Sequence, residues 1–314
     1  METEFKDQAI LVTGASGFIG SHLSRRLSDL GAVVHGVSRT HAPGLHDGVH
    51  WQQCDLRDAT AVASLVEELR PVRIFHLAGL VSGDRRIEAV QPMLENNFLS
   101  ALNLLAAATA SGCERIVIAG SLEEPGQGPE AVPVSPYAAA KGAATAYAQM
   151  FHSLYGTPVV IARLFMVYGP GQHDIKKLVP YTAVSLQQNQ APAISNGTRP
   201  VDWIYIDDVV EGLIACSLSN QVLGTSVDIG SGRLATVAEV VDCLCELSGS
   251  GLRPVMGAAP NRGTERVRVA DAADASARLG WTANVPLRDG LKRTLEWYGA
   301  RLDDGSLAGV STDL

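Results

Sequence analysis

The sequence has few of the features that mark an exported, membrane-spanning or nucleic-acid-binding protein. No apolar run approaches the roughly 18 residues of a transmembrane helix. The first residues, METEFKDQ, are polar and acidic, unlike a secretory signal. The net charge is −8, so there is no basic excess to bind nucleic acid or an anionic membrane surface. We therefore expect a cytoplasmic protein.

Cysteine is also scarce, and its spacing does not indicate a disulfide framework or a metal site. No two of the cysteines have the spacing C-x-x-C, and an odd number of them is typical of a reducing cytosol. We expect core packing rather than metal binding, with Cys243 and Cys245 on different faces of one helix. The five cysteines are Cys54, Cys113, Cys216, Cys243 and Cys245.

Strand and helix patterns alternate through the first two-thirds of the 314 residues. This alternation predicts an α/β protein with a doubly wound parallel sheet, a Rossmann fold. The expected strands are 9–14, 32–38, 50–56, 72–79, 114–121 and 158–165. The expected helices are 18–30, 59–69, about 92–111 and 136–155.

A glycine-rich turn follows the first expected strand, in the stretch LVTGASGFIG of residues 11–20. Glycine permits a tight bend and a close approach to the backbone, and the amides at a helix N-terminus bind phosphate. A strand, the pattern G-x-x-G-x-x-G and a helix therefore predict a dinucleotide-binding turn. The cofactor-binding residues expected here are Gly14, Ser16, Gly17, Phe18, Ile19 and Gly20.

The end of the second expected strand indicates which dinucleotide is bound. NAD-binding folds often place an acidic residue there to accept the ribose 2′-hydroxyl. This chain has Ser38 and then Arg39, and an arginine can pair with a 2′-phosphate. The pattern favours NADP over NAD, and NAD stays possible.

Three further residues form a chemical pattern. Ser121 ends the fifth expected strand, and Tyr137 and Lys141 lie four positions apart on one face of the next helix. A lysine ammonium near a phenol favours the phenolate, and Ser121 can hydrogen-bond the same substrate oxygen. This combination indicates hydride transfer between a nicotinamide and a carbinol or ketone.

Together these motifs resemble those of an extended short-chain dehydrogenase/reductase, in the NAD(P)-dependent nucleotide-sugar epimerase/dehydratase family. The resemblance covers nearly the whole chain and includes TGASGFIG, CDLRD, HLAG, SPYAAAK, RLFMVYGPGQ and DWIYIDDVVEG. It implies that Asp55 and Leu56 lie by the adenine. It also implies a cofactor contact for Leu77, Ala78 and Gly79, with Asn97 behind the active site. Tyr137 and Lys141 then match the catalytic pair, with Ser121 as their partner.

The same resemblance implies two domains and a nucleotide-sugar substrate. Residues 1–168, with a return segment of about 203–248, would bind the dinucleotide. Residues 169–202 and 249–314 would form a smaller C-terminal substrate-binding domain, with a helix at about 178–188, an irregular tail from Gly249 and a last helix at about 287–301. Asp271 resembles a position near the lid. The substrate-binding residues implied are Val81, Met166, Lys177, Leu178, Val179, Arg199 and Arg266.

Several residues depart from the family pattern. Met166 stands where the family usually has asparagine, and Val201 occupies an arginine position for which Arg199 would compensate. After the catalytic serine the family motif usually ends in Val-Tyr-Gly. Here the stretch is SLEEPG, with Pro125 in the tyrosine position. The connection to Tyr137 is shorter than in most members, which indicates a trimmed loop over the sugar.

The two glutamates of the stretch SLEE do not decide which reaction the protein catalyses. In sugar 4,6-dehydratases an acid at the position of Glu123 removes a proton beside the new ketone. A second acid often precedes it in those enzymes, but this chain has Leu122 at that position. The two carboxylates can equally be a solvated loop. We rank an NADPH-dependent 4-ketoreductase first, then a C4-epimerase, then a dehydratase.

A non-catalytic dinucleotide-sensing protein is the alternative from another class. Retention of both Tyr137 and Lys141 argues against it. Apolar, alanine-rich stretches in the helices at about 92–111 and 136–155 lead us to expect a homodimer through a four-helix contact.

Overall fold

The computed structural model describes residues 2–39, 48–126, 131–258 and 267–304. Its internal contacts divide the chain into two compact units. The first consists of Met1–Leu164, Val210–Ile229 and Ala273–Trp281, and the second of Phe165–Val209, Gly230–Ala272 and Thr282–Leu314. We describe each unit by itself.

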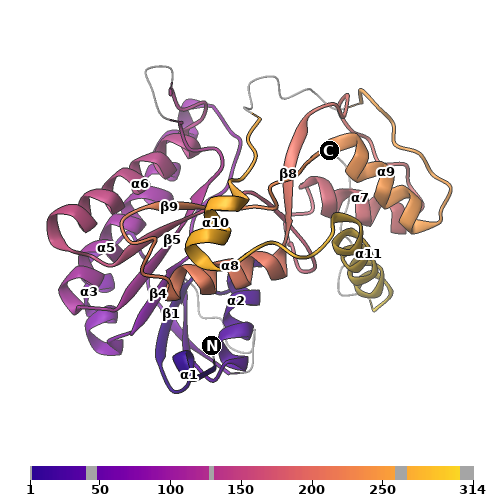
Figure 1. Ribbon diagram of the computed structural model, residues 1–314. Helices are drawn as coiled ribbons and strands as arrows, with labels where there is room; N and C mark the ends of the chain where they lie inside the picture. The colour runs from indigo at the N-terminus through magenta and orange to yellow at the C-terminus, as the bar shows by residue number, and fades with distance from the viewer. Residues whose placement is uncertain (1, 40–47, 127–130, 259–266, 305–314) are drawn as a thin grey trace. The chain divides into compact units, whose positions relative to one another are not determined.

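The first unit is built on a seven-stranded sheet in which every neighbouring pair is parallel (Figure 1). The strand order is β3-β2-β1-β4-β5-β6-β9. Strands β2 and β3 follow one another on one side of β1, and the later strands β4, β5, β6 and β9 follow on the other side. This confirms the doubly wound parallel fold. The strands are β1 (Ala9–Thr13), β2 (Val33–Ser38), β3 (Val49–Gln53), β4 (Arg73–His76), β5 (Arg115–Ser121), β6 (Val159–Leu164) and β9 (Ser226–Ile229).

Burial explains why these short runs are strands. Every residue of β4 and β5 is buried, as expected of central strands covered by helices on both faces. The edge strand β3 is only partly buried. Apolar side chains such as Leu11, Ile116 and Ile161 pack with Leu104 and Leu105 in one core, each fully buried.

Helices cover the sheet. Figure 1 shows α3, α5 and α6 along one face of the sheet. Two other helices, α2 and α8, are joined by an ion pair of 2.7 Å between Arg26 and Glu211. The longer helices are α2 (Phe18–Asp29), α3 (Ala59–Leu69), α5 (Ser100–Ser111), α6 (Pro136–Tyr155) and α8 (Ile206–Leu218). The shorter ones are α1 (Glu2–Phe5), the 3₁₀ turn η1 (Ile87–Ala89), α4 (Val90–Met93), the π-helical turn η2 (Leu94–Leu99) and α10 (Ala272–Leu279).

The second unit has a three-stranded sheet in the order β10-β8-β7 and three packed helices. Its buried Asp202 accepts hydrogen bonds from the backbone N–H groups of Ser231 (2.8 Å), Gly232 (3.0 Å) and Ala270 (3.0 Å). One carboxylate therefore holds two loops to β8. The elements are β7 (Met166–Tyr168), β8 (Pro200–Tyr205), β10 (Leu234–Thr236), α7 (Leu178–Gln187), α9 (Val237–Ser248) and α11 (Leu287–Asp303).

The structure differs from expectation in two places. The tail after Gly249 is not wholly irregular, because it contains α10, whose only buried residue is Ala275. A helix that buries one side chain shows no apolar stripe in sequence. The return segment to the first unit is Val210–Ile229 rather than about 203–248, since Gly230–Ala272 belongs to the second unit.

The cysteines are all free. Four of them are buried, and Cys243 is half-buried while Cys245 on the same helix is buried, as their different faces predicted. Within the described residues, no helix has the length and apolar character needed to span a membrane. The same residues contain no group of three or more His, Cys, Asp or Glu side chains arranged to hold a metal ion.

Candidate active site

The glycine turn connects β1 to α2 through a backbone that only small residues permit. Gly14 has φ +69°, and a Cβ on Gly20 would collide with the Gly14 carbonyl oxygen. The N–H of Gly17 donates to that carbonyl at 2.9 Å. Gly17 is the N-cap of α2, and no side chain among the described residues caps it. The amides of Phe18 and Ile19 therefore lie in a first turn whose N–H groups have no helical partner, which suits a phosphate.

The edge formed by β2 and β3 carries the residues expected near the adenosine. Ser38 ends β2, and the exposed Arg39 accepts a hydrogen bond from the Gln53 amide at its backbone oxygen, at 3.2 Å. Asp55 pairs with Arg57 at 2.7 Å. That hydrogen bonding lowers the pKa of Asp55 to about 2, with a smaller contribution from the charge of Arg39. Next to them, Leu56 is buried.

The segment after β4 is held by a buried amide. Asn97 lies in the π-helical turn η2, accepts from the N–H of Leu80 at 3.1 Å and donates to the Leu80 carbonyl at 3.0 Å. A Cβ on Gly79 would lie 2.6 Å from the Asn97 carbonyl oxygen. Asn97 thus braces the loop that contains Ala78 and Gly79, and Gly79 leaves room for it. A π-helical turn is often found at functional sites.

A second buried network below this loop was not predicted. Thr13, the last residue of β1, has its hydroxyl 2.8 Å from Nδ1 of His76, the last residue of β4. The N–H of Ala78 donates to the same hydroxyl at 3.2 Å. The residue after His76, Leu77, donates its N–H to the Thr13 carbonyl at 3.2 Å. The stretch HLAG contains this histidine, but its pattern alone does not indicate a partner on β1.

The residues expected to be catalytic lie at the carboxyl end of β5 and in the first turns of α6. Ser135 caps α6 by accepting from the N–H of Ala138 at 3.1 Å, and Pro136 occupies the first helical position. These two residues set where the helix starts and so where Tyr137 and Lys141 lie. The exposed fractions of Ser121, Tyr137 and Lys141 are 7%, 6% and 7%.

These side chains are connected to one another and to the backbone. The Lys141 ammonium donates to the Ala119 carbonyl at 2.8 Å, and it also lies beside Gly79. Ser121 hydrogen-bonds the Tyr137 phenol. The Ser121 oxygen accepts from the N–H of Glu123 at 3.2 Å, which leaves the hydroxyl proton to be donated elsewhere.

Burial shifts the pKa values of Tyr137 and Lys141 in opposite directions. Burial raises the pKa of Tyr137 to about 12; the hydrogen bond with Ser121 opposes that rise, and the charges of Glu123 and Glu124 add to it. Burial lowers the pKa of Lys141 to about 8, against the charge of Glu124. Burial is the largest cause of the Tyr137 shift and favours the protonated phenol in this structure, and the role of Lys141 in stabilising a phenolate stays a prediction.

The two acids of SLEE differ in environment. Leu122 and Glu123 are half-buried, whereas Glu124 is buried with 3% of its surface exposed. One Glu124 carboxylate oxygen accepts from the N–H of Ser121 at 2.7 Å, and the other accepts from the Thr145 hydroxyl at 3.0 Å. A solvated loop is therefore the wrong interpretation for Glu124.

The residues expected to bind substrate are distributed over both units. Val81 belongs to the first unit and is 59% exposed. Met166 and Arg199 are half-buried in the second unit. Lys177 is the N-cap of α7, followed by the half-buried Leu178 and the buried Val179. The exposed Asp271 is in the second unit, and Arg266 lies outside the described residues. Their contacts with substrate stay predictions.

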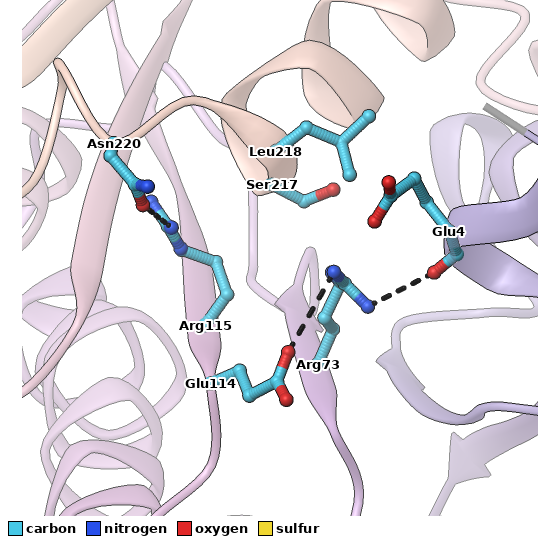
Figure 2. Close-up of a pocket in the computed structure, with 7 residues that line it drawn as sticks. All are labelled: Glu4, Arg73, Glu114, Arg115, Ser217, Leu218 and Asn220. Atoms are coloured by element: carbon cyan, nitrogen blue, oxygen red, sulfur yellow. Dashed lines mark hydrogen bonds and ion pairs between the residues drawn. The ribbon is translucent and has the colours of Figure 1, made fainter.

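A cavity of about 350 Å³ in the first unit lies at the amino ends of β4 and β5 (Figure 2). Ser121 is at the opposite, carboxyl end of β5. Both arginines that line the cavity donate hydrogen bonds to other groups of the protein. Arg115 donates to the Ser219 carbonyl at 2.6 Å and to Asn220 at 2.7 Å, while Arg73 donates to the Glu4 carbonyl at 3.3 Å. The cavity contains none of the expected site residues. Its lining residues are Glu4, Arg73, Glu114, Arg115, Ser217, Leu218 and Asn220.

Comparison with known proteins gives one family and many relatives. Residues 10–230 match the model of the NAD dependent epimerase/dehydratase family. The chain is 26% identical over 311 residues to the UDP-glucuronate 4-epimerase of Thermodesulfobacterium geofontis, covering 91% of this chain and 95% of that one. It is 29% identical over 312 residues to the dTDP-glucose 4,6-dehydratase of Streptomyces antibioticus, covering 92% of each chain.

Solved structures are similar over the same length. One is the UDP-glucuronic acid 4-epimerase of Bacillus cereus, in complex with UDP-glucuronic acid and NAD. It superposes with a TM-score of 0.81 at 25% identity, covering 92% of this chain and 98% of the other. The fold is therefore shared over nearly the full chain.

Proposed function

Because the chain belongs to the NAD-dependent epimerase/dehydratase family, we propose that it transfers a hydride at C4 of a nucleotide-diphosphate sugar, with NADPH-dependent reduction of a 4-keto sugar as its net reaction. The observation that carries this proposal is the buried arrangement of Ser121, Tyr137 and Lys141 at the carboxyl end of β5. In an open α/β sheet, ligands bind outside the carboxyl ends of the strands.

The residues around the glycine turn fit a dinucleotide. The uncapped first turn of α2 offers N–H groups to a pyrophosphate, and a side chain on Gly14 would meet the backbone of Leu77 and Ala78. Ser38 and Arg39 would hold the adenosine ribose, with Arg39 pairing with a 2′-phosphate. Asp55 and Leu56 would lie by the adenine. When bound, the nicotinamide supplies the hydride.

The chain's own residues would handle the proton. The Ser121 oxygen already accepts from the N–H of Glu123, so its hydroxyl proton can be donated to the sugar oxygen at C4. Tyr137 would give its phenolic proton to that same oxygen as the ketone becomes an alcohol. Lys141 would stabilise the phenolate left behind through its positive charge.

Two features favour reduction over dehydration. The raised pKa of Tyr137 favours the protonated phenol, the form needed to donate a proton to a ketone oxygen. Dehydration needs further acid and base groups beside the sugar. Leu122 cannot supply a proton, and the carboxylate of Glu124 is engaged by Ser121 and Thr145. Glu123 is then the candidate base for dehydration.

A 4-epimerase is the second candidate. The observation in its favour is the similarity to 4-epimerases, one of them in complex with NAD. Epimerisation would use the same serine, tyrosine and lysine, but the hydride would return to the sugar from the opposite side. Substrate contacts would come from Val81, Met166, Lys177, Leu178, Val179 and Arg199.

An assay with two arms tests the proposal. The first supplies a nucleotide 4-keto-6-deoxysugar with NADPH, and the second a nucleotide hexose in deuterated water without added reductant. We expect NADPH consumption in the first arm and neither water loss nor deuterium at C5 in the second. Glu123→Gln should cost less than about tenfold in kcat. Water loss with deuterium at C5, abolished by Glu123→Gln, would instead identify a dehydratase, and a C4 epimer from the hexose an epimerase.

A further inference from the structure

Glu124 is a buried carboxylate directly behind the proposed reaction site. It follows the strand β5 by three residues, in the position where the family motif Val-Tyr-Gly has its valine. Its two oxygens connect three elements: one accepts from the backbone N–H of Ser121 on β5, and the other accepts from Thr145 on α6 and lies 3.9 Å from Arg163 on β6. An apolar residue could make none of these contacts.

The neighbouring backbone leaves room for the carboxylate. A Cβ on Gly120 would lie 2.6 Å from a Glu124 oxygen, and a Cβ on Gly142 would lie 2.8 Å from the Pro125 ring that follows it. Both glycines lie at the site, one in β5 and one beside Lys141 in α6. The chain is thus locally adapted to an acid at this position, because larger residues would displace it.

Charges of both signs face Glu124. Arg163 provides one positive charge and is itself paired with Asp228 of β9 at 2.8 Å. Lys141 of α6 provides the other, and both positive charges oppose the burial that raises the pKa of Glu124. Glu123 and Glu124 both raise the pKa of Tyr137, and the charge of Lys141 helps to lower the pKa of the buried His76 on β4.

We propose that Glu124 is a positioning residue of this site, whose carboxylate fixes the backbone of Ser121 and whose negative charge supports the Lys141 ammonium. The inference rests on the proposed function, which makes this the reaction site, but the contacts of Glu124 do not depend on the substrate. Burial lowers the pKa of Lys141 to about 8, and the charge of Glu124 opposes this effect. Removing the charge of Glu124 should therefore lower the pKa of Lys141 further. A larger fraction of Lys141 would then be neutral at the pH of the reaction.

The test is the titration of Lys141 in the intact chain, followed by NMR of lysines labelled with ¹³C at Cε. The chain has five lysines (Lys6, Lys141, Lys176, Lys177 and Lys292), and the spectrum of Lys141→Met assigns the signal. We expect a midpoint near pH 8 in the unsubstituted chain. Glu124→Gln, which keeps the shape, should lower it by roughly one pH unit. Glu124→Val, which installs the usual family residue, should do the same if the glutamine variant does not fold.

Two matched variants separate charge from shape. Glu124→Asp keeps the charge, so its Lys141 midpoint should stay close to that of the unsubstituted chain. Glu123→Gln removes the adjacent charge and should leave the Lys141 midpoint in place. An unchanged midpoint in Glu124→Gln or Glu124→Val would overturn the inference, as would an equal shift in Glu123→Gln.

Turnover measurements distinguish this inference from the proposed function. With a nucleotide 4-keto sugar, Glu124→Gln should lower kcat while KM for the sugar stays the same, because Glu124 does not touch substrate in this account. The alkaline limb of kcat should move to lower pH together with the Lys141 midpoint. A shifted midpoint in a chain that reduces no nucleotide sugar refutes the proposed function alone. Turnover with an unmoved midpoint refutes the role of Glu124 alone.

Discussion

The hydroxyl of Thr13 lies 2.8 Å from Nδ1 of His76, so the last residues of β1 and β4 are joined by a buried hydrogen bond. Ser100 donates its proton to the Asn96 carbonyl at 2.7 Å, so it can only accept from Nε2 of His76 at 3.4 Å. This arrangement places the imidazole proton on Nε2 and leaves Nδ1 to accept from Thr13. Below the proposed cofactor loops, His76 is therefore a neutral connector.

His76 should make the protein sensitive to acid. Burial, with a smaller effect from the Lys141 charge, lowers its pKa from 6.5 to about 3. Between these values the unfolded chain binds a proton that the folded chain does not, so stability falls as pH falls. We expect a loss of about 1.4 kcal/mol per pH unit from this group below pH ~6. Urea unfolding at pH 7, 6 and 5 measures it, and His76→Gln should show a shallower dependence. Equal slopes would contradict this role.

Arg39 should discriminate between the two dinucleotides. Arg39→Ala removes one charge-assisted contact to a 2′-phosphate, worth about 1.5–3 kcal/mol, and leaves the contacts to the rest of the dinucleotide. NADPH binding should therefore weaken by roughly tenfold or more, while NADH binding changes little. Calorimetric titration with each cofactor measures both. Equal losses for the two would show that Arg39 does not recognise the 2′-phosphate.

Exposed apolar side chains on α6 and on the adjoining elements α4 and η2 predict a homodimer. Tyr147, Leu154 and Tyr155 of α6 are 42%, 66% and 59% exposed, and Val90 and Leu94 of α4 and η2 are 44% and 48% exposed. A two-fold contact between copies would bury them on both partners. Light scattering at micromolar concentration should give twice the chain mass of 33.1 kDa. A monomer mass would contradict the prediction, and Leu154→Glu should weaken a dimer.

Removal of the Tyr137 hydroxyl should separate chemistry from binding. Tyr137→Phe keeps the ring in its buried position but leaves no phenolic proton, so kcat should fall by about 10²–10⁴-fold. Dinucleotide affinity should change little, which fluorescence titration can check. Near-normal turnover in the phenylalanine variant would show that another group supplies the proton.

The parts of the account that depend on local spacing could be predicted from sequence. The turn from Gly14 to Gly20 follows from backbone rules that act within one strand and one helix. The positions of Tyr137 and Lys141 follow from one helical turn. The start of α6 at Pro136 agrees with the expected range because Ser135 is a local cap.

The parts that depend on distant partners could not be predicted. Glu124 is buried only because Thr145, 21 positions away, and Arg163 on a neighbouring strand accommodate its carboxylate. Thr13 and His76 are 63 positions apart. The pKa of Tyr137 depends on its burial, and that depends on the packing of whole elements rather than on a lysine four residues away. A pattern of residue types contains none of this information.

The central claim is that a hydride passes to C4 of a nucleotide sugar. Its most direct test is to incubate the protein with a nucleotide 4-keto-6-deoxysugar and NADPH that carries deuterium at both positions of the nicotinamide C4. The sugar is then analysed by mass spectrometry and NMR. The account predicts one deuterium at C4 of a 4-hydroxy product, formed at a rate that falls about 10²–10⁴-fold in Tyr137→Phe. A sugar that returns without deuterium at C4, while the unsubstituted protein is folded and binds NADPH, would contradict it.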